Sequence, residues 1–330
     1  MSESRAIEAV DVAKDYSGAA ALRGVSFTVA HGELFGLVGP DGAGKTTLLR
    51  LLVGLLSLSG GTVHIDGIDV SADPARVKER IGYMSQRFSL SETLTVAENL
   101  LYVSEVWHVP RGERRKRVTR LLEFSRLGPF QDRLTRNLSG GMKQKLSLCV
   151  CLIHQPRILL LDEPTIGVDP ISRRDFWLIL YDLLQEGSTI FLSTPYMDEA
   201  ERCGRVGFLL DGRLIACGPP AALRSSLGTV ILDLRCADSR QARHLLQRVP
   251  GLGEAGLGEA SLREAVIFGE HVHVTIPRTG IDPAAAVAQA RAAGVVVHDW
   301  RLREPSLEDV FLSYIHRHGA SQPDPAAAAP

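Results

Sequence analysis

The stretch G-P-D-G-A-G-K-T, residues 39 to 46, decides the fold class of this chain. The apolar run E-L-F-G-L-V at 33 to 38 predicts a buried strand before it, and a helical pattern begins near Lys45. A strand, a glycine-rich turn and a helix in this order match the phosphate-binding loop G-x-x-x-x-G-K-[ST] in both letters and context. The glycines let backbone N–H groups converge on phosphate oxygens, and the helix N-terminus adds the positive end of its dipole.

The residues of this loop have separate predicted roles. Lys45 supplies a positive charge to the β and γ phosphates, and Thr46 supplies a hydroxyl to Mg²⁺. Asp41 is a negative charge close to phosphates, so we expect its side chain to point outward. The residues predicted to bind nucleotide in this segment are Gly39, Pro40, Asp41, Gly42, Ala43, Gly44, Lys45, Thr46 and Thr47.

A second acidic element is expected on the other side of the metal. The segment R-I-L-L-L-D-E-P at 157 to 164 predicts a buried strand that carries Asp162 at its carboxyl end, where ligands bind in open α/β sheets. Asp162 is predicted to bind Mg²⁺ through its water shell, and Glu163 to polarise the attacking water. The acidic pair alone is weak evidence, and the phosphate loop before it makes the prediction strong.

Short apolar runs alternate with helical patterns from about residue 6 to 220, which predicts a parallel sheet covered by helices on both faces. Strand patterns disappear between about 87 and 156, which predicts a helical insertion. Asp211-Gly212 lies between two short apolar runs and predicts a β-hairpin. Residues 1–228 are therefore predicted to form one α/β domain of the phosphate-loop type.

The composition changes after A-C-G-P-P at 216 to 220. The elements expected beyond it are strand 229–236, helix 239–248, strand 265–276, helix 283–293, strand 295–301 and helix 306–316. This alternation predicts a small α/β domain over residues 229–318, of the ferredoxin-like type. His271 and His273 share one strand face without a recognisable metal-ligand spacing, so we expect a satisfied or solvated pair. Residues 319–330 are too poor in large apolar side chains to pack and predict a disordered tail.

Net charge and cysteine usage narrow the classes of partner and compartment. The 37 basic and 38 acidic residues give a net charge of -1, which does not point to a nucleic acid as partner. The basic run at 111 to 117 is interpreted as a solvated helix face rather than a phosphate-binding patch. Cys149 and Cys151 lie on different faces of a predicted helix, which does not suit a metal pair. The five cysteines are odd in number and scattered, which predicts a reduced cytosolic compartment. No apolar run approaches the ~18 to 20 residues of a membrane span.

The stretch N-L-S-G-G-M-K-Q-K, residues 137 to 145, resembles the signature motif of the ATP-binding cassette (ABC) family. The resemblance covers residues 6 to about 220 and implies ATP and Mg²⁺ as ligands. Ser139, Gly140 and Gly141 begin a helix, so a hydroxyl and bare amides form an anion site. In the family this site closes over the γ phosphate held by a second ABC subunit. One copy of each half-site therefore implies a dimer, most simply a homodimer.

The resemblance also implies roles for three further residues. Gln86, in I-G-Y-M-S-Q, matches the glutamine that links Mg²⁺ and the attacking water to the helical insertion. Asp169, in T-I-G-V-D-P, matches the loop that contacts the opposite subunit. Tyr16, in A-K-D-Y-S-G, matches the aromatic residue that stacks on adenine, and edge packing is the alternative.

The single cassette and the ending E-P-S-L-E-D-V-F-L-S-Y-I at 304 to 315 resemble the ATPase subunits of bacterial drug and antibiotic exporters. Such subunits work in pairs beneath a separately encoded permease, so we expect a cytoplasmic location, peripheral on the inner face of the cell membrane. Arg87–Leu94 are the predicted permease contact, with a plain surface loop as the alternative. An ABC ATPase that acts on ribosomes or nucleic acid is a second hypothesis. The single cassette, the lack of long coiled coils and the missing basic patch disfavour it.

Pro195, in S-T-P-Y-M-D-E-A, departs from the family pattern, in which a histidine usually contacts the γ phosphate. Proline offers neither a side-chain donor nor an N–H. Loss of one positioned donor typically lowers the rate of such a reaction by about 10² to 10³. We therefore expect slow ATP hydrolysis that depends on Glu163. The alternative is that the chain acts as an ATP-binding gate or sensor that hydrolyses slowly. With Thr194 as N-cap, Pro195 is predicted at the first position of a helix that has Asp198 and Glu199 in its first turn.

Overall fold

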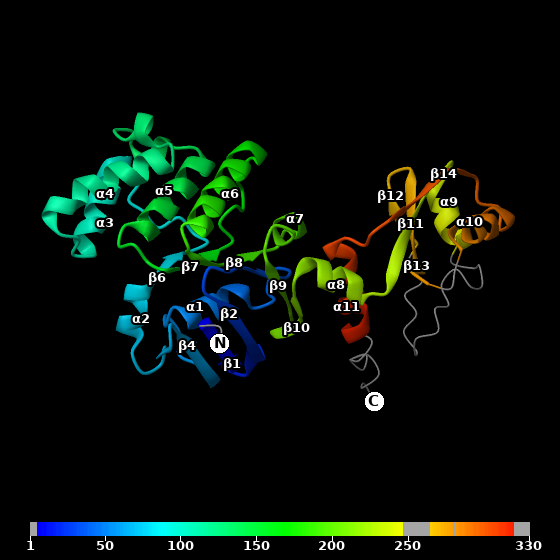
Figure 1. Ribbon diagram of the computed structural model, residues 1–330, viewed down its shortest axis with the longest axis horizontal. Coiled ribbons are helices and arrows are strands. Elements are labelled where there is room, and N and C mark those ends of the chain that lie inside the picture. The colour runs from blue at the N-terminus through cyan, green and yellow to red at the C-terminus, as the bar shows by residue number, and fades with distance from the viewer. Residues whose placement is uncertain (1–4, 247–264, 280–281, 320–330) are drawn as a thin grey trace. The chain divides into compact units, whose positions relative to one another are not determined.

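The computed structural model describes residues 5–246, 265–279 and 282–319, and Figure 1 shows the arrangement of their helices and strands. The chain divides into two compact units, the first ending at Gly218 and the second beginning at Pro219. The predicted boundary at residue 228 lies later than the observed one. The reason is that α8 (Pro220–Ser226) packs on α11 (Leu307–Gly319), which belongs to the second unit.

The N-terminal unit is built on a six-stranded sheet with the order β10-β9-β3-β8-β7-β6. Its strands are β3 (Leu34–Val38), β6 (Ile81–Met84), β7 (Ile158–Asp162), β8 (Thr189–Thr194), β9 (Arg205–Leu210) and β10 (Arg213–Gly218). All neighbours are parallel except the β9–β10 pair, a hairpin that turns at Asp211 and Gly212, both with positive φ. Every residue of β3, β7 and β8 is buried, which explains their continuous apolar runs.

A second, antiparallel sheet with the order β2-β1-β4-β5 belongs to the same unit and was not predicted. Its strands are β1 (Arg5–Tyr16), β2 (Ala19–Ala30), β4 (Gly60–Ile65) and β5 (Ile68–Asp69). One apolar core joins both sheets to α1 (Lys45–Leu52), whose leucines at 48, 49, 51 and 52 are buried in it. The remaining helices of this part are α2 (Pro74–Arg80), α6 (Pro170–Gln185) and α7 (Met197–Ala200). The helix α1, which follows the phosphate loop, therefore shares one apolar core with both sheets.

The predicted helical insertion is confirmed as α3 (Val96–Val106), α4 (Arg111–Phe124) and α5 (Gly140–Leu152), which stand together in Figure 1. Two short 3₁₀ helices, Gly128–Phe130 and Thr135–Asn137, connect α4 to α5. The three long helices share an apolar core of their own, separate from the core between the sheets. Cys149 and Cys151 of α5 are buried with free thiols that donate to the carbonyl groups of different neighbours, Leu121 and Tyr83.

The C-terminal unit has the predicted ferredoxin-like topology, an antiparallel sheet with the order β12-β13-β11-β14 and two helices between strands. Its elements are β11 (Thr229–Cys236), α9 (Ser239–Leu246), β12 (Ala265–Phe268), β13 (His271–Pro277), α10 (Pro283–Ala292) and β14 (Val297–Arg303). The single strand predicted over 265–276 is wrong, because the chain reverses at Gly269, where φ is positive. The predicted tail begins one residue early, since α11 includes Gly319, and residues 320–330 lie outside the described part.

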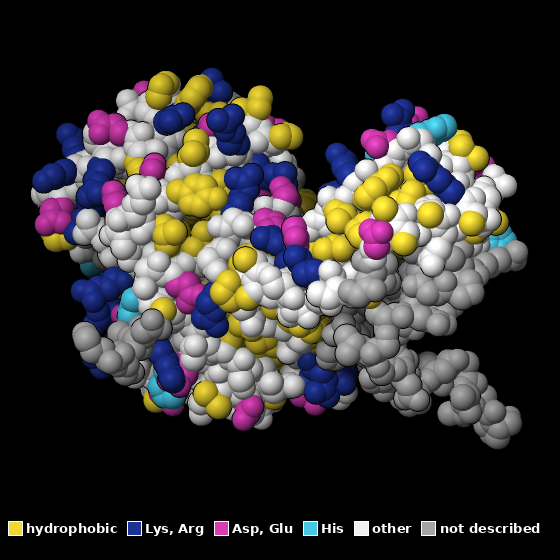
Figure 2. All heavy atoms as spheres, turned by 45° about the vertical axis from the view of Figure 1, so that its right-hand side comes forward, with side chains coloured by type: hydrophobic (Ala, Val, Ile, Leu, Met, Phe, Trp, Pro, Cys, Tyr) yellow, Lys and Arg dark blue, Asp and Glu magenta, His cyan; other side chains and the backbone are white. Residues whose placement is uncertain are grey.

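Charged side chains of both signs are intermixed over the face shown in Figure 2, in keeping with the net charge of -1. Within the described ranges, no helix combines the length and the apolar character that crossing a bilayer requires.

Candidate active site

The phosphate loop connects β3 to α1, as predicted. Gly39 and Gly44 are required by close packing, because a Cβ would lie 2.3 Å from the carbonyl oxygen of Leu209 at the first position and 2.8 Å from that of Ala21 at the second. Gly44 also has a φ of 107°, and no side chain caps the helix that it begins. Pro40, Asp41 and Gly42 are exposed, Ala43 is buried, and Thr46 and Thr47 are half-buried in the first turn of α1. Asp41 therefore lies at the surface, as expected.

Lys45, Glu163 and Gln86 meet in one cluster, although they come from three separate segments of the chain. Lys45 Nζ lies 3.0 Å from Glu163 Oε1, and both side chains are 4% exposed. The same Nζ donates hydrogen bonds to the carbonyl oxygens of Gly39 at 2.8 Å and Pro40 at 3.0 Å. Gln86 Nε2 donates to the other carboxylate oxygen of Glu163 at 2.6 Å. The structure thus joins the predicted phosphate-binding lysine, the predicted base and the glutamine.

Asp162 lies beside this cluster and keeps one carboxylate oxygen free of protein donors. Thr46 Oγ1 and Ser193 Oγ both donate to Asp162 Oδ1, at 3.1 Å and 2.8 Å. Asp162 Oδ2 is buried and has no hydrogen-bond partner among the described residues. Burial is the main cause that raises the pKa of Asp162, which the hydrogen bonds from Ser193 and Thr46 partly offset. A free, hard carboxylate oxygen next to a hydroxyl is the donor set that suits Mg²⁺.

Ser193 is a site residue that was missed in the sequence. It pairs with Asp162 in the parallel register of β7 and β8, and its hydroxyl also accepts a hydrogen bond from the backbone N–H of Glu163 at 3.0 Å. Glu163 itself has a φ of 49°, a left-handed conformation that costs a non-glycine residue about 1–3 kcal/mol. The available signal was Ser193 at the carboxyl end of a buried strand, which is where parallel sheets place functional groups.

The signature residues lie at the start of α5. Ser139 caps this helix, with its hydroxyl accepting from the N–H of Met142 at 3.3 Å. Ser139 and Gly140 are exposed, whereas Lys45 and Glu163 are buried. The structure therefore does not bring the signature into the buried cluster of the same chain.

Asp169 and Tyr16 lie outside the cluster as well. Asp169 caps α6 by accepting hydrogen bonds from the N–H groups of Ile171 and Ser172, and these bonds, the one from Ser172 above all, lower its pKa. Tyr16 ends β1 with 44% of its surface exposed, and Lys14 Nζ lies 5.3 Å from the centre of its ring. Its predicted contact with adenine stays a prediction.

Pro195 does not begin a helix, which contradicts its predicted place. The helix starts at Met197 with Tyr196 as N-cap, and Pro195 lies in a half-buried bend between β8 and α7. The reason is local: Thr194 Oγ1 accepts a hydrogen bond from the N–H of Tyr196 at 3.0 Å, which closes a turn over Pro195. Thr194 is therefore the cap of this turn and not of the helix.

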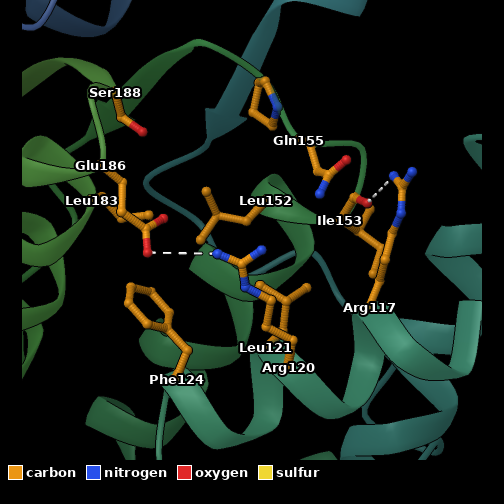
Figure 3. Close-up of a pocket in the computed structure, with 11 residues that line it drawn as sticks. Arg117, Arg120, Leu121, Phe124, Leu152, Ile153, Gln155, Leu183, Glu186 and Ser188 are labelled. Atoms are coloured by element: carbon orange, nitrogen blue, oxygen red, sulfur yellow. Dashed lines mark hydrogen bonds and ion pairs between the residues drawn. The ribbon is translucent and has the colours of Figure 1, made fainter. Parts of the chain in front are cut away.

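A hollow of about 240 Å³ in the same unit is lined by none of the predicted site residues. Figure 3 shows Leu121, Phe124 and Leu152 among the lining side chains, with Arg120 reaching between Phe124 and Leu152 toward Glu186 and Arg117 to one side. Arg117 donates to the carbonyl oxygen of Ile153 at 3.2 Å, and Arg120 forms an ion pair with Glu186 at 3.5 Å. Within the basic run at 111 to 117, Arg114 and Arg117 thus already have protein partners, Arg114 donating to the carbonyl oxygen of Val109 at 2.8 Å.

Several known proteins are similar to this chain. A family model described as "ABC transporter" matches residues 22–166. The probable multidrug ABC transporter ATP-binding protein YbhF of Escherichia coli K12 is 39% identical over 89% of this chain, and the chain spans about half, 49%, of that relative. The daunorubicin/doxorubicin resistance ATP-binding protein DrrA of Streptomyces peucetius is 36% identical over 94% of this chain and 92% of its own length. A dimeric post-hydrolysis structure of an ATP-binding cassette with ADP and Pi covers 64% of this chain and 98% of its own, with a TM-score of 0.60 and 27% identity.

Proposed function

Since the chain belongs to the ABC transporter family, we propose that it binds and hydrolyses ATP as the ATPase subunit of an exporter, with a separately encoded membrane permease. The observation that carries this proposal is the cluster of Lys45, Glu163 and Gln86 next to the free oxygen of Asp162. It combines a phosphate-binding cation, a base and a metal ligand, the groups that phosphoryl transfer to water requires.

The ion pair between Lys45 and Glu163 supports an order in which ATP binds first and Glu163 then acts as a base. The phosphates of ATP compete for Lys45, because the N–H groups of the loop and of α1 hold them beside its ammonium group. Glu163 is then released to accept a proton from water, while Gln86 holds its other oxygen. Mg²⁺, held by Thr46, Asp162 and Gln86, would neutralise charge on the phosphates.

The position of the signature supports a dimer as the active form. Ser139 and Gly140 are exposed, so in a second copy of the chain, or in a related ABC subunit, they are available to cover the γ phosphate of this one. Asp169, at the start of α6, would contact the partner in the same assembly. A homodimer then contains two complete ATP sites.

The segment Arg87–Leu94, directly after Gln86, is the proposed permease contact. The buried amide of Asn99 anchors this segment, since it accepts from the N–H of Ser91 at 3.2 Å and donates to its carbonyl at 3.0 Å. Leu101, Tyr102 and Val106 of α3 are exposed apolar side chains that could extend the contact. The names of the relatives, which mention multidrug transport and daunorubicin/doxorubicin resistance, favour drug-like or other hydrophobic cargo. A location at the inner face of the membrane follows from the proposed permease contact.

Slow hydrolysis is part of the proposal. Pro195 carries no donor for the γ phosphate, and Glu163 remains as base, so turnover is slow and depends on Glu163. Pro195→His should raise the rate of ATP hydrolysis by the purified chain, because imidazole restores a donor. An unchanged rate in this variant would show that residue 195 does not limit hydrolysis.

Glu163→Gln tests the function itself. We expect this variant to bind ATP and to lose hydrolysis by about 10²-fold or more, because the amide cannot accept the proton of water. Glu105→Gln, a change of the same kind at an exposed ion pair of α3, is the control and should hydrolyse ATP like the wild type. Hydrolysis that survives in Glu163→Gln would contradict the assigned base.

Co-purification of the chain with the permease encoded by the neighbouring reading frame tests the role in transport. A lack of association would contradict that role.

A further inference from the structure

Glu199 is a buried carboxylate that takes no part in the chemistry described above. It lies in the short helix α7, and only 1% of its surface is exposed. Three neutral donors converge on it, from the loop after β7, from α6 and from the end of β8. Thr165 Oγ1 donates to Oε1 at 2.5 Å, Trp177 Nε1 donates to Oε1 at 3.3 Å, and Thr194 Oγ1 donates to Oε2 at 2.7 Å. Burying a carboxylate without a cation is costly, so these hydrogen bonds must hold it.

Two of the three donors belong to the segments that carry the reacting groups. Thr165 follows Glu163 by two residues, and the intervening turn is closed by a hydrogen bond from the N–H of Ile166 to the carbonyl of Glu163. Thr194 follows Ser193, which contacts both Asp162 and the N–H of Glu163. Glu199 therefore ties the loop after β7 to the end of β8.

The protons of this network can be arranged in only one way around Thr194. Its hydroxyl accepts from the N–H of Tyr196, so its single proton is the one that reaches Glu199. The same hydroxyl thus closes the turn over Pro195 and anchors that turn to the carboxylate. Pro195 cannot hold itself in place by a side-chain or N–H hydrogen bond.

We propose that Glu199 is a positioning residue for ATP hydrolysis, one that fixes the loop of Glu163 and the bend of Pro195 relative to each other. This inference rests on the proposed function and adds to it the group that sets the geometry of these two segments. Glu199 acts through Thr165 and Thr194 and does not touch the phosphates.

The test compares Glu199→Gln with Asp198→Asn, the same kind of change at the exposed neighbouring residue of α7. In Glu199→Gln the amide nitrogen carries two protons toward groups that donate to the carboxylate in the wild type, so at least one of these hydrogen bonds must reverse or break. We expect the turnover number to fall by about 10- to 100-fold, while the dissociation constant for ATP, measured by calorimetric titration, stays within about two-fold of wild type. Amide exchange should accelerate in residues 163–169 and 193–197. Asp198→Asn should change none of these quantities.

A second pair of variants keeps the inference testable if Glu199→Gln does not fold. Thr194→Ser retains the hydroxyl and should turn over ATP like the wild type, whereas Thr194→Val should be slow with unchanged ATP affinity. A purely structural role would instead lower the melting temperature and ATP affinity together. Wild-type turnover in folded Glu199→Gln or in Thr194→Val overturns the inference.

Failure of the proposed function is a separate result. If the wild type and Glu163→Gln hydrolyse ATP equally, the assigned base is wrong. In that case amide exchange still tests the positioning role of Glu199. If exchange at residues 193–197 is not faster in Glu199→Gln than in the wild type, that role is overturned.

Discussion

Asp162 is a buried carboxylate whose unpartnered oxygen needs an explanation. Its oxygen Oδ2 is buried without a partner among the described residues, and burial raises its pKa. A buried carboxylate oxygen that has no hydrogen-bond partner costs free energy, which the described protein groups alone do not offset here. The free oxygen is explained if a divalent cation binds it.

Asp162→Asn should therefore abolish hydrolysis that depends on Mg²⁺. We expect a loss of about 10²- to 10³-fold in turnover, with ATP binding in the absence of Mg²⁺ retained, because Lys45 and the loop amides are untouched. The measurement is ATP titration with and without Mg²⁺, beside a hydrolysis assay. Since the pKa of Asp162 is raised, protons should also compete with Mg²⁺ at a higher pH than for an ordinary aspartate. Unchanged Mg²⁺ dependence in the variant would remove Asp162 from the metal site.

At the level of elements, the close approach of α5 and α6 depends on one glycine. A Cβ at Gly141 would lie 2.3 Å from Cβ of Ser172, whereas a Cβ at Gly140 would lie 3.6 Å from its nearest neighbour, the carbonyl oxygen of Gly167. The first distance cannot be reached without moving a helix, and the second is an ordinary contact.

Gly141→Ala should therefore lower the free energy of unfolding by about 1–3 kcal/mol, the usual cost of overpacking. Gly140→Ala is the matched control and should leave the stability of the chain close to that of the wild type. Adding Ser172→Gly to Gly141→Ala should restore part of the loss, because it removes the clashing atoms. Chemical denaturation of the three variants checks this, and equal stability of the two alanine variants would contradict the proposed clash.

The sheet of the C-terminal unit carries a second buried carboxylate, Asp233, which is 1% exposed as a side chain. His271 Nδ1 lies 2.7 Å from its Oδ1, and Arg301 Nε donates to its Oδ2 at 2.8 Å. Burial by itself would raise the pKa of Asp233, but the hydrogen bonds from Arg301 and His271 and the charge of His273 lower it. Burial also lowers the pKa of His273. The histidine pair is thus satisfied by protein groups, as expected from the sequence.

Both shifts make this unit less stable in acid. A group whose pKa is depressed by folding contributes stability that is lost as the pH falls, because the unfolded chain takes up the proton first. The loss should begin below pH 6.5 through His273 and continue below pH 3.8 through Asp233. Asp233→Asn should cost about 1–3 kcal/mol at neutral pH, with the exposed Asp299→Asn as control. Denaturation followed through Trp300 from pH 8 to 3 measures this, and a flat profile would contradict it.

At the level of the whole molecule, the two units have separate cores. The clusters around α1 and in the helical insertion lie in the first unit, and the core of the ferredoxin-like sheet lies in the second. The helix α8 contains Leu223, which is buried, and it packs on α11.

A chain that ends at Gly218 should therefore fold and bind ATP within about two-fold of the full chain, because domains with their own core fold alone. A chain that ends at Gly228 keeps α8 without α11 and should associate or precipitate through Leu223 and Leu227. Size-exclusion chromatography and ATP titration distinguish the two chains. A soluble longer chain beside an insoluble shorter one would instead assign α8 to the first unit.

The sequence by itself determined the phosphate loop, the acidic pair and the alternation of elements, because local geometry sets each of them. A glycine with positive φ, a helix start and a run of apolar residues are properties of a few consecutive positions. The family resemblance added Gln86, and the structure places it on Glu163. Local patterns gave wrong predictions at two places. At Gly269 a positive φ divides the predicted strand into two, and at Pro195 the hydroxyl of Thr194 caps a turn instead of the predicted helix.

Only the tertiary structure decided which groups meet across the sheet. The pairing of β7 with β8 puts Ser193 beside Asp162, and the packing of α7 brings Glu199 to Thr165 and Thr194. The contacts of Asp162 with Ser193 and of Glu199 with Thr165 join residues about 30 positions apart, so no short pattern of letters contains them. Their register and burial follow from how the strands and helices pack, and that packing turns separate residues into a site.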